Sequence, residues 1–323
     1  MDTDIHASLW LWAAFNIGIL VLLVVDLGIF HREAHAVSVR EAALWTVTWV
    51  SLAMAFDLGV YLLADPEPGL AFLTGYVIEL SLSVDNIFVF VLLFAYFAVP
   101  PAYQHRVLFW GILSVILMRG SVIVAGSVLV EQLHWILYVF GALLIISAWR
   151  MATQGGGHDD PSQNPAVRFI RRFFPVTENY EGHRFFVRRD GVFMVTPLFI
   201  VLVALNTTDL VFAIDSIPAI FAITHDPFIV YTSNLCAVMG LRSMYFLLAG
   251  VVDRFHYLQF GLSVILAFVG TKMLLEDVYE VPIAASLGVI AAVITVAVAA
   301  SLVRPKDQVA ASEDSHPESP HPA

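Results

Sequence analysis

Long apolar stretches recur along most of this 323-residue chain, and they restrict its fold more than any other feature. A helix needs about 20 mostly apolar residues to cross a hydrocarbon core of about 30 Å. The composition agrees with repeated crossing: 59% of the residues are apolar and only 13% are charged. The mean hydropathy of +0.82 is also unlike that of a soluble domain. We therefore predict an all-α polytopic membrane protein.

The apolar stretches predict about nine transmembrane helices, at residues 8–30, 42–63, 70–98, 107–130, 133–149, 192–223, 228–251, 259–275 and 282–303. No lysine or arginine precedes the first stretch, where a secretory signal peptide carries positive charge. We therefore expect the first stretch to be a retained helix.

Basic residues indicate the orientation of these helices. All but three of the 16 lysines and arginines fall in segments that an external N-terminus would leave in the cytoplasm. The three exceptions, Arg119, Arg242 and Lys272, lie inside predicted spans. Because the cytoplasmic loops of membrane proteins carry the excess of Lys and Arg, the pattern predicts an N-out, C-in topology.

Two similar motifs indicate an internal repeat. ELSLSVDNIFVF (79–90) and DLVFAIDSIPAI (209–220) each contain an acid, five further residues, an aspartate, a small polar residue and an isoleucine. In the N-out topology the two motifs cross the membrane in opposite directions. We therefore predict an inverted repeat of three-helix units, an arrangement typical of alternating-access transporters. Chance similarity between two apolar helices is the alternative.

The repeat divides the chain into six predicted parts. These are helices one and two (1–69), the first repeat (70–150), a cytoplasmic basic linker (151–191), the second repeat (192–276), a final helix (277–304) and a disordered cytoplasmic tail (305–323). The linker contains RFIRRFFP and FFVRRDG, basic and aromatic stretches that we expect to contact anionic lipid headgroups.

Helical geometry predicts which polar residues of the motifs share a face. Six residues at about 100° each place Glu79 and Asp85 about 120° apart around a regular helix. The two predicted polar faces are Glu79, Ser83 and Asn86, and Asn206, Asp209 and Ser216. These faces can oppose each other, whereas Asp85 and Asp215 can join them only at a helix interface or at a local unwinding. Pro218 favours unwinding beside Asp215, although an ordinary proline kink is an equal alternative.

Acids inside a membrane indicate a bound cation, bound protons or ion pairs, because an unpaired carboxylate there costs a few kcal/mol. Arg119 and Arg242 are the expected internal partners, and a purely structural salt-bridge network is the alternative. Oxygen ligands of this kind suit Mn²⁺, Mg²⁺ or Ca²⁺. Asp26, in the first span, could line an ion route or form a structural pair. The only cysteine, Cys236, excludes an internal disulfide and is expected to be a packing residue.

Four segments closely resemble the TerC family, and the layout is similar to its Alx-type members: FLTGYVIELSLSVDNIFVF (72–90), TDLVFAIDSIPAIFAITHDPFIV (208–230), TSNLCAVMGLRSMYFLLAG (232–250) and VPIAASLGV (281–289). The resemblance implies a bacterial inner-membrane protein linked to Mn²⁺ export and tellurium resistance. It also implies metal-handling roles for Glu79, Asp85, Asp209 and Asp215. Asn206 stands where family members commonly have Glu, so one negative charge of the family pattern is missing.

The leading hypothesis is a secondary transporter, not an enzyme, that exports Mn²⁺ through a midplane carboxylate site, with proton exchange as a candidate coupling. The predicted metal ligands are Glu79, Asp85, Asn206, Asp209 and Asp215. The predicted supporting or pathway residues are Ser83, Asn86, Ser216, Arg119, Arg242 and Asp26. No permanently bound cofactor and no nucleic acid are expected, and the expected partners are a divalent metal ion and membrane lipids. A homo-oligomer or another protein partner is compatible with the sequence.

The alternative hypothesis is a membrane scaffold or accessory factor that transports nothing itself. It would serve the response to metal or tellurium stress, or the metalation of exported proteins, and its acids would be structural.

Overall fold

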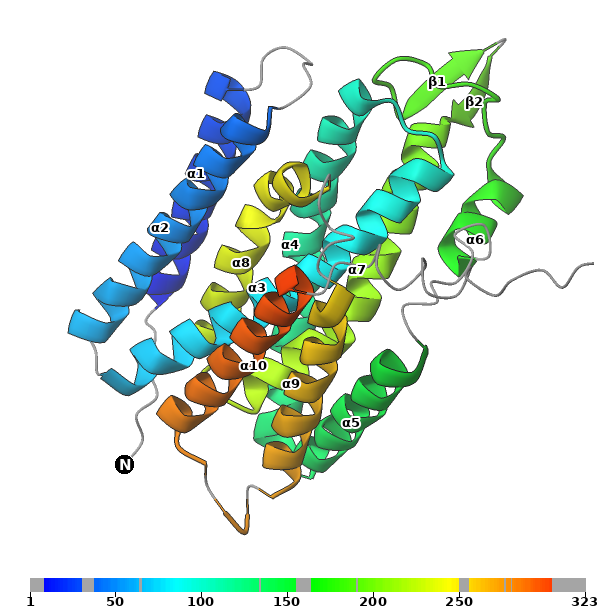
Figure 1. Cartoon of the computed structure of the whole chain (residues 1–323). Coiled ribbons are helices and arrows are strands. Elements are labelled where there is room, and N and C mark those ends of the chain that lie inside the picture. Colours follow the sequence, from blue (N-terminus) through cyan, green and yellow to red (C-terminus); the bar gives the residue numbers. More distant parts are fainter. Residues whose placement is uncertain are drawn as a thin grey trace, which may run out of the picture.

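Ten α-helices and one β-hairpin make up the part of the chain that the computed structural model describes (Figure 1). That part comprises residues 9–30, 38–63, 66–133, 135–154, 164–189, 191–249, 256–275, 277–279 and 281–303. The helices are α1 (Leu9–Phe30), α2 (Val39–Leu63), α3 (Pro66–Tyr96), α4 (Pro101–Gln132), α5 (Ile136–Gln154), α6 (Pro165–Phe173), α7 (Pro197–Phe221), α8 (Pro227–Leu248), α9 (His256–Leu274) and α10 (Ile283–Val303). Every helix except the short α6 overlaps one predicted span.

Seven of the described helices are long and apolar enough to cross a membrane: α2, α3, α4, α5, α7, α9 and α10. The described apolar segment of α1, Leu9–Val25, is shorter. Helix α8 is less apolar because it carries Thr232, Ser233, Asn234 and Arg242, all of which are buried against other helices. The chain is thus a mainly helical, multi-pass integral membrane protein, while the full count of nine crossings and their orientation stay predictions.

Proline marks the start of several helices. Pro101, Pro165, Pro197 and Pro227 each occupy the first turn of a helix, where the missing amide proton has no intrahelical partner to lose. At α8, Asp226 also caps the helix, because its Oδ1 accepts hydrogen bonds from the amides of Phe228 at 2.8 Å and Ile229 at 3.3 Å. These local signals explain why the helices start where they do.

Helices α3 and α8 form the centre of the bundle. Helix α3 is unbroken over 31 residues, about 46 Å at 1.5 Å per residue, and it runs obliquely through the bundle in Figure 1. Tilt therefore accommodates its length. Helix α3 packs on α7 and α8, α4 also packs on α7 and α8, and α5 packs on α9. The helices of the two predicted repeats thus interlock and do not form separate bundles.

The segment before α7 differs from the prediction. Val192–Val195 is strand β2, which pairs antiparallel with β1 (Phe186–Arg189), so the helix starts at Pro197 and not at 192. The cue in the sequence is the Asp190–Gly191 dipeptide between two runs of strand-forming residues. Gly191 has a φ of 80°, a left-handed conformation that glycine adopts without strain. The chain therefore contains a small hairpin, which an all-α prediction missed.

The predicted basic linker is partly structured. It contains α6 and β1, whereas residues 155–163 and the predicted tail at 305–323 lie outside the described residues. Between α6 and β1, the Tyr180 hydroxyl donates a hydrogen bond of 2.7 Å to the Phe97 carbonyl beyond the end of α3. Burial raises the pKa of Tyr180 to about 12, so this donor keeps its proton at neutral pH. The contact ties the linker to the helical bundle.

Of the two interpretations of Pro218, unwinding or an ordinary kink, the structure shows no unwinding. Helix α7 continues through Pro218 and ends only at Phe221. A proline near the end of a helix removes one backbone hydrogen bond, and the remaining turn still packs through the buried Ile217, Ala219 and Ile220. The helix therefore tolerates the proline without a break beside Asp215.

Candidate functional site

One buried arginine joins the two repeat motifs. Arg119 of α4 is only 1% exposed. Its Nε donates to Asp209 Oδ2 at 3.0 Å and its Nη2 donates to Asp209 Oδ1 at 3.1 Å. Its Nη1 donates to Glu79 Oε1 and thereby forms a second salt bridge. The first acids of the two motifs, on α3 and α7, therefore meet at one point in the interior.

Two asparagines complete this cluster. Asn234 of α8 donates from Nδ2 to Glu79 Oε2 at 2.9 Å and accepts from Arg119 Nη1 at 3.3 Å. Asn86 of α3 donates from Nδ2 to Asp209 Oδ1 at 3.4 Å. We call Glu79, Asn86, Arg119, Asp209 and Asn234 the polar cluster. Four helices contribute to it, so its geometry depends on how the whole bundle packs.

The two predicted polar faces do oppose each other. Glu79, Ser83 and Asn86 are all buried along one side of α3, and Asp209 and Ser216 are buried along one side of α7. The hydrogen bond from Asn86 to Asp209 joins the two sides directly. Asn206, one turn before Asp209, is half-buried, and its Oδ1 would lie 3.8 Å from a Cβ placed on Gly111 of α4. The helical spacing is therefore confirmed for Asn86 and Asp209, whereas Asn206 lies beside α4.

Three oxygens stand out in this region. The buried Ser83 Oγ and Asn206 Oδ1 have no hydrogen-bond partner among the described residues. The Ser216 hydroxyl is buried beside the Glu79 carboxylate. Buried polar atoms normally have a partner, so the two unpartnered oxygens of α3 and α7 leave acceptor capacity next to the cluster.

The second acids of the motifs lie apart from the polar cluster. Asp215 of α7 is half-buried and accepts a hydrogen bond of 2.7 Å from Ser147 Oγ of α5. Asp85 of α3 is also half-buried and does not share the face of Glu79, as the 120° separation predicts. The structure thus does not bring the four predicted acids together in one place.

Two further predicted residues are Arg242 and Asp26. Arg242 of α8 is buried, and its Nη1 lies 3.5 Å from His105 Nε2 near the start of α4. Arg119, by contrast, is the residue that bridges the acids. Asp26 belongs to α1, but its side chain is outside the described residues. In α2, the buried Asp57 Oδ1 has no hydrogen-bond partner among the described residues.

In this arrangement the polar cluster has few free ligands for a metal ion. Within the described ranges, no group of three His, Cys, Asp or Glu side chains is close enough to hold a metal ion. Arg119 occupies the space between the two carboxylates that a cation would take. The chemistry available is therefore cation pairing by Glu79 and Asp209, with amide and hydroxyl oxygens beside them.

Sequence reasoning missed Asn234. The residue lies in TSNLCAVMGLR, and the run of Thr, Ser and Asn within a mainly apolar helix is the signal that could have found it. Polar residues inside membrane helices usually face other helices and not lipid. Its contact with both Glu79 and Arg119 follows only from the way α8 packs against α3 and α4.

Comparison with known proteins now identifies the family. Residues 64–309 match the model of the "Integral membrane protein TerC family". This range contains all four helices of the polar cluster. The chain belongs to the TerC family. The resemblance of the two acidic motifs to that family is therefore confirmed.

Relatives of known sequence match almost the whole length of this chain. A protein of Myxococcus xanthus, "Uncharacterized membrane protein STKORF319", is 50% identical over 294 residues, which cover 91% of this chain and 92% of the relative. A protein of Salmonella typhi, "Putative membrane-bound redox modulator Alx", is 48% identical over 88% of this chain and 92% of the relative. The protein of the same name from Escherichia coli K12 is 47% identical over 87% of this chain and 90% of the relative. No solved structure matches the chain.

Proposed function

We propose that the protein is a secondary transporter that exports Mn²⁺, with Glu79 and Asp209 as the central pair of its ion site. The convergence of these two carboxylates, from matching positions of the two motifs, carries the proposal. Arg119 supplies one formal positive charge against two formal negative charges. Because buried carboxylates need compensation, a divalent cation in place of Arg119 would balance both.

In this proposal Arg119 holds the empty site together and withdraws when an ion enters. The unpartnered oxygens of Ser83 and Asn206 would then complete the coordination with neutral ligands. Oxygen ligands of this type suit hard divalent cations. The preference for Mn²⁺ over Mg²⁺ or Ca²⁺ rests on the family resemblance and not on these oxygens. We propose that Asp85 and Asp215, which lie outside the polar cluster, serve the route of the ion or exchange protons.

Packing supports movement of two related halves. If α3, α4 and α5 correspond to α7, α8 and α9, the contact of α4 with α7 has its counterpart in the contact of α8 with α3. Helix α5 packs on its own counterpart α9, and α3 packs on α7. An inverted repeat related by a two-fold axis in the membrane plane predicts this pattern. Exchange of the conformations of the halves would open the site to either side.

The proposal is tested by Mn²⁺ flux into proteoliposomes with and without a pH gradient. We expect Glu79→Gln and Asp209→Asn to lower flux by about tenfold or more, equivalent to at least about 1.4 kcal/mol. Asp85→Asn and Asp215→Asn should lower it as well. The matched control is Glu67→Gln, an exposed acid in the first turn of the same helix as Glu79. If the Glu79→Gln and Asp209→Asn variants both carried Mn²⁺ as fast as the unmutated protein, the proposal would be contradicted.

The second candidate function is a membrane scaffold or accessory factor whose acids serve structure alone. The observation in its favour is that Arg119 already pairs both acids of the cluster. A protein of this class would lose stability in the same acid variants but move no Mn²⁺ in the parental form. A measurement of Mn²⁺ flux by the unmutated protein therefore separates the two candidate functions before any variant is made.

The name of the Salmonella relative describes it as a redox modulator. The 323 residues of this chain contain one cysteine, Cys236, which is a free thiol on α8. Thiol–disulfide exchange within a chain requires a second cysteine. A redox role of this chain therefore cannot use an intrachain disulfide, and an indirect role through the metal content of the cell fits the transport proposal.

A further inference from the structure

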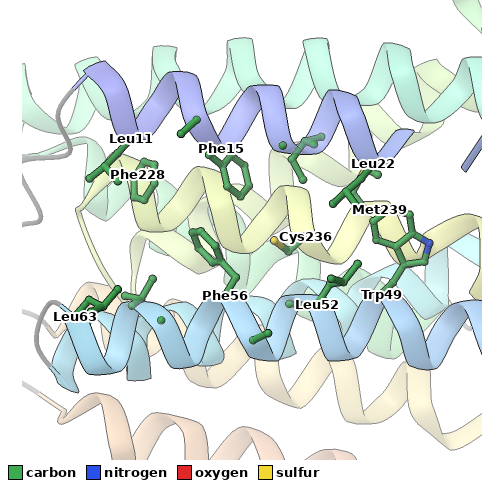
Figure 2. Close-up of a pocket in the computed structure, with 17 residues that line it drawn as sticks. Leu11, Phe15, Leu22, Trp49, Leu52, Phe56, Leu63, Phe228, Cys236 and Met239 are labelled. Carbon is green, nitrogen blue, oxygen red and sulfur yellow. The ribbon is translucent and has the colours of Figure 1, made fainter. Parts of the chain in front are cut away.

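An apolar cavity of about 750 Å³ lies between α1, α2 and α8. Figure 2 shows its walls, with Phe15 on α1, Trp49 and Phe56 on α2, and Phe228 and Met239 on α8. Its volume falls within the range of about 300–1,000 Å³ that ligand sites occupy. None of the polar cluster residues lines it, so the cavity is separate from the candidate ion site.

The cavity is elongated along the helices and has the depth of one lipid leaflet. Its lining runs from Leu11 to Leu22 on α1 and from Phe228 to Met239 on α8, about 17 Å in each case at 1.5 Å per residue. On α2 it runs from Trp49 to Leu63, about 21 Å. One leaflet contributes about half of a hydrocarbon core of about 30 Å. On all three helices the lining begins near the end closest to the connection between α2 and α3 and extends just past the middle of the helix. The cavity therefore follows the path of a single acyl chain in that leaflet.

The lining excludes water and polar ligands. No charged side chain of the described residues lines the cavity, and the only polar groups among the lining side chains are the Trp49 indole and the Cys236 thiol. A buried water needs two to four polar partners, so water would not fill this volume. An empty cavity would forgo the dispersion contacts of all its walls. The bilayer beside α1 and α2 supplies a solvent of matching chemistry.

We propose that this cavity binds one acyl chain of a membrane phospholipid. The absence of charged lining residues in the described part of the chain means that the site selects the chain and not the headgroup. The bound chain would also support α8, because Cys236 and Met239 face it from positions two and five residues after Asn234. The proposal is independent of the proposed Mn²⁺ transport.

Two glycines allow the cavity to be filled by mutation. A Cβ on Gly18 of α1 or on Gly59 of α2 would meet nothing within 4 Å, although both residues line the cavity. Gly18→Phe and Gly59→Phe should therefore place a ring in the cavity from a position where the Cβ itself meets no neighbour. The matched control is Gly288→Phe on α10, where a Cβ also meets nothing within 4 Å and which does not line the cavity.

The first test is photocrosslinking in vesicles of phosphatidylethanolamine and phosphatidylglycerol that carry a diazirine in one acyl chain. We expect adducts on the cavity-lining segments of α1, α2 and α8 in the parent and in Gly288→Phe, and their loss in Gly18→Phe and Gly59→Phe. Equal adduct yields on these segments in the parent and in both folded cavity variants would overturn the proposal.

The second test uses the parental chain, so it does not depend on the folding of a variant. Cys236 is the only cysteine and lines the cavity, and its rate of alkylation by a membrane-soluble maleimide reports access to the space. We expect slow alkylation in lipid nanodiscs and faster alkylation after the lipid is exchanged for cholate, a detergent whose rigid steroid body has no acyl chain to enter the cavity. A rate that does not change on removal of lipid would overturn the proposal.

Discussion

Arg119 is the residue on which the interior of the bundle depends most. It is 1% exposed and forms salt bridges with two acids from different helices. Removal of one partner from a buried ion pair leaves an uncompensated charge, which is more costly than replacement of the whole pair by apolar groups. Variants that remove only the Arg119 cation should therefore lose more folding stability than variants that remove one of its acidic partners.

We predict that Arg119→Met lowers the free energy of unfolding by about 3–5 kcal/mol, because Glu79 and Asp209 lose their shared cation. Addition of Glu79→Gln to Arg119→Met should recover part of the loss, since it removes one unpaired charge. Denaturant titration in mixed micelles measures both effects. The control is Arg189→Met, whose guanidinium is 62% exposed and pairs with Glu181 at 2.5 Å, and which should change stability by less than about 1 kcal/mol. Equal stability of the Arg119 and Arg189 variants would contradict a structural role of the cluster.

At the scale of elements, α5 and α9 approach each other through glycines. A Cβ on Gly270 of α9 would lie 2.9 Å from the carbonyl oxygen of Gly141, and a Cβ on Gly141 of α5 would lie 3.0 Å from the carbonyl oxygen of Gly270. Small residues at such contacts let membrane helices pack closely. Because the nearest atoms belong to backbone, a flexible side chain cannot move away to relieve a clash.

We predict that Gly270→Ala costs about 1–3 kcal/mol of stability by overpacking the contact between α5 and α9. Gly288→Ala on α10 is the control, because its Cβ would meet nothing within 4 Å, and it should stay within about 0.5 kcal/mol of the parent. Thermal unfolding in detergent measures the difference. If Gly270→Ala unfolds at the same temperature as Gly288→Ala, the close helix contact is not part of the native packing.

Helix α6 is the element best suited to a membrane surface. Val167 is fully buried against the bundle, whereas Phe169 and Phe173 are 59% and 61% exposed, and arginines occupy positions 168, 171 and 172. Exposed aromatic and basic side chains on one short helix are typical of interfacial segments. We therefore expect the linker to contact anionic headgroups through α6.

We predict slower amide hydrogen exchange in α6 in nanodiscs of anionic lipid than in nanodiscs of zwitterionic lipid. Replacement of both Arg171 and Arg172 by Gln should remove most of the difference, because each basic residue near an anionic surface contributes about 1 kcal/mol. Exchange in α9 serves as the internal control, since that helix lies within the bundle. Equal protection of α6 in the two lipids would show that its aromatic and basic side chains do not contact headgroups.

At the scale of the whole molecule, the predicted orientation places the hairpin and α6 in the cytoplasm and the connection between α9 and α10 outside. The prediction rests on the location of the basic residues. Arg189, in β1, and Val278, between α9 and α10, are 62% and 82% exposed, respectively. Both positions are therefore accessible to a reagent on the correct side of the membrane.

We predict that an impermeant maleimide labels Val278→Cys in intact cells and labels Arg189→Cys only after the membrane is permeabilised. Both variants are made in a Cys236→Ala background, so that each carries one thiol. Labelling after permeabilisation confirms that both thiols can react. The reverse result, with Arg189→Cys labelled first, would invert the topology and with it the direction of the two motifs.

Much of the fold was accessible from local patterns. Long apolar runs predicted each long helix, because a helix in lipid satisfies its backbone hydrogen bonds within one segment. The hairpin was missed because Val192–Val195 is itself apolar and is separated from the apolar body of α7 only by Thr196 and Pro197. Its antiparallel pairing with Phe186–Arg189 competes successfully with helix formation, and only that pairing reveals where α7 starts.

The candidate site was predictable in its faces but not in its partners. The spacing of Glu79, Ser83 and Asn86 follows from 3.6 residues per turn, a property of one helix. Which cation meets Glu79 and Asp209, and that Asn234 joins them, depends on four helices at once. Arg119 and Arg242 are alike as residues in apolar helices, and packing alone places the first between the acids and the second beside His105.

The sequence by itself determined that this chain enters a membrane as a set of helices, that its two acidic motifs match, and that the family is TerC. These properties depend on hydrophobicity, helical period and residue identity, all of which are local. The tertiary structure alone decided that the first acids of the two motifs, on different helices, converge on Arg119. It also decided that α1, α2 and α8 together line an apolar cavity. Those outcomes depend on contacts between segments far apart in the chain, and no local pattern encodes them.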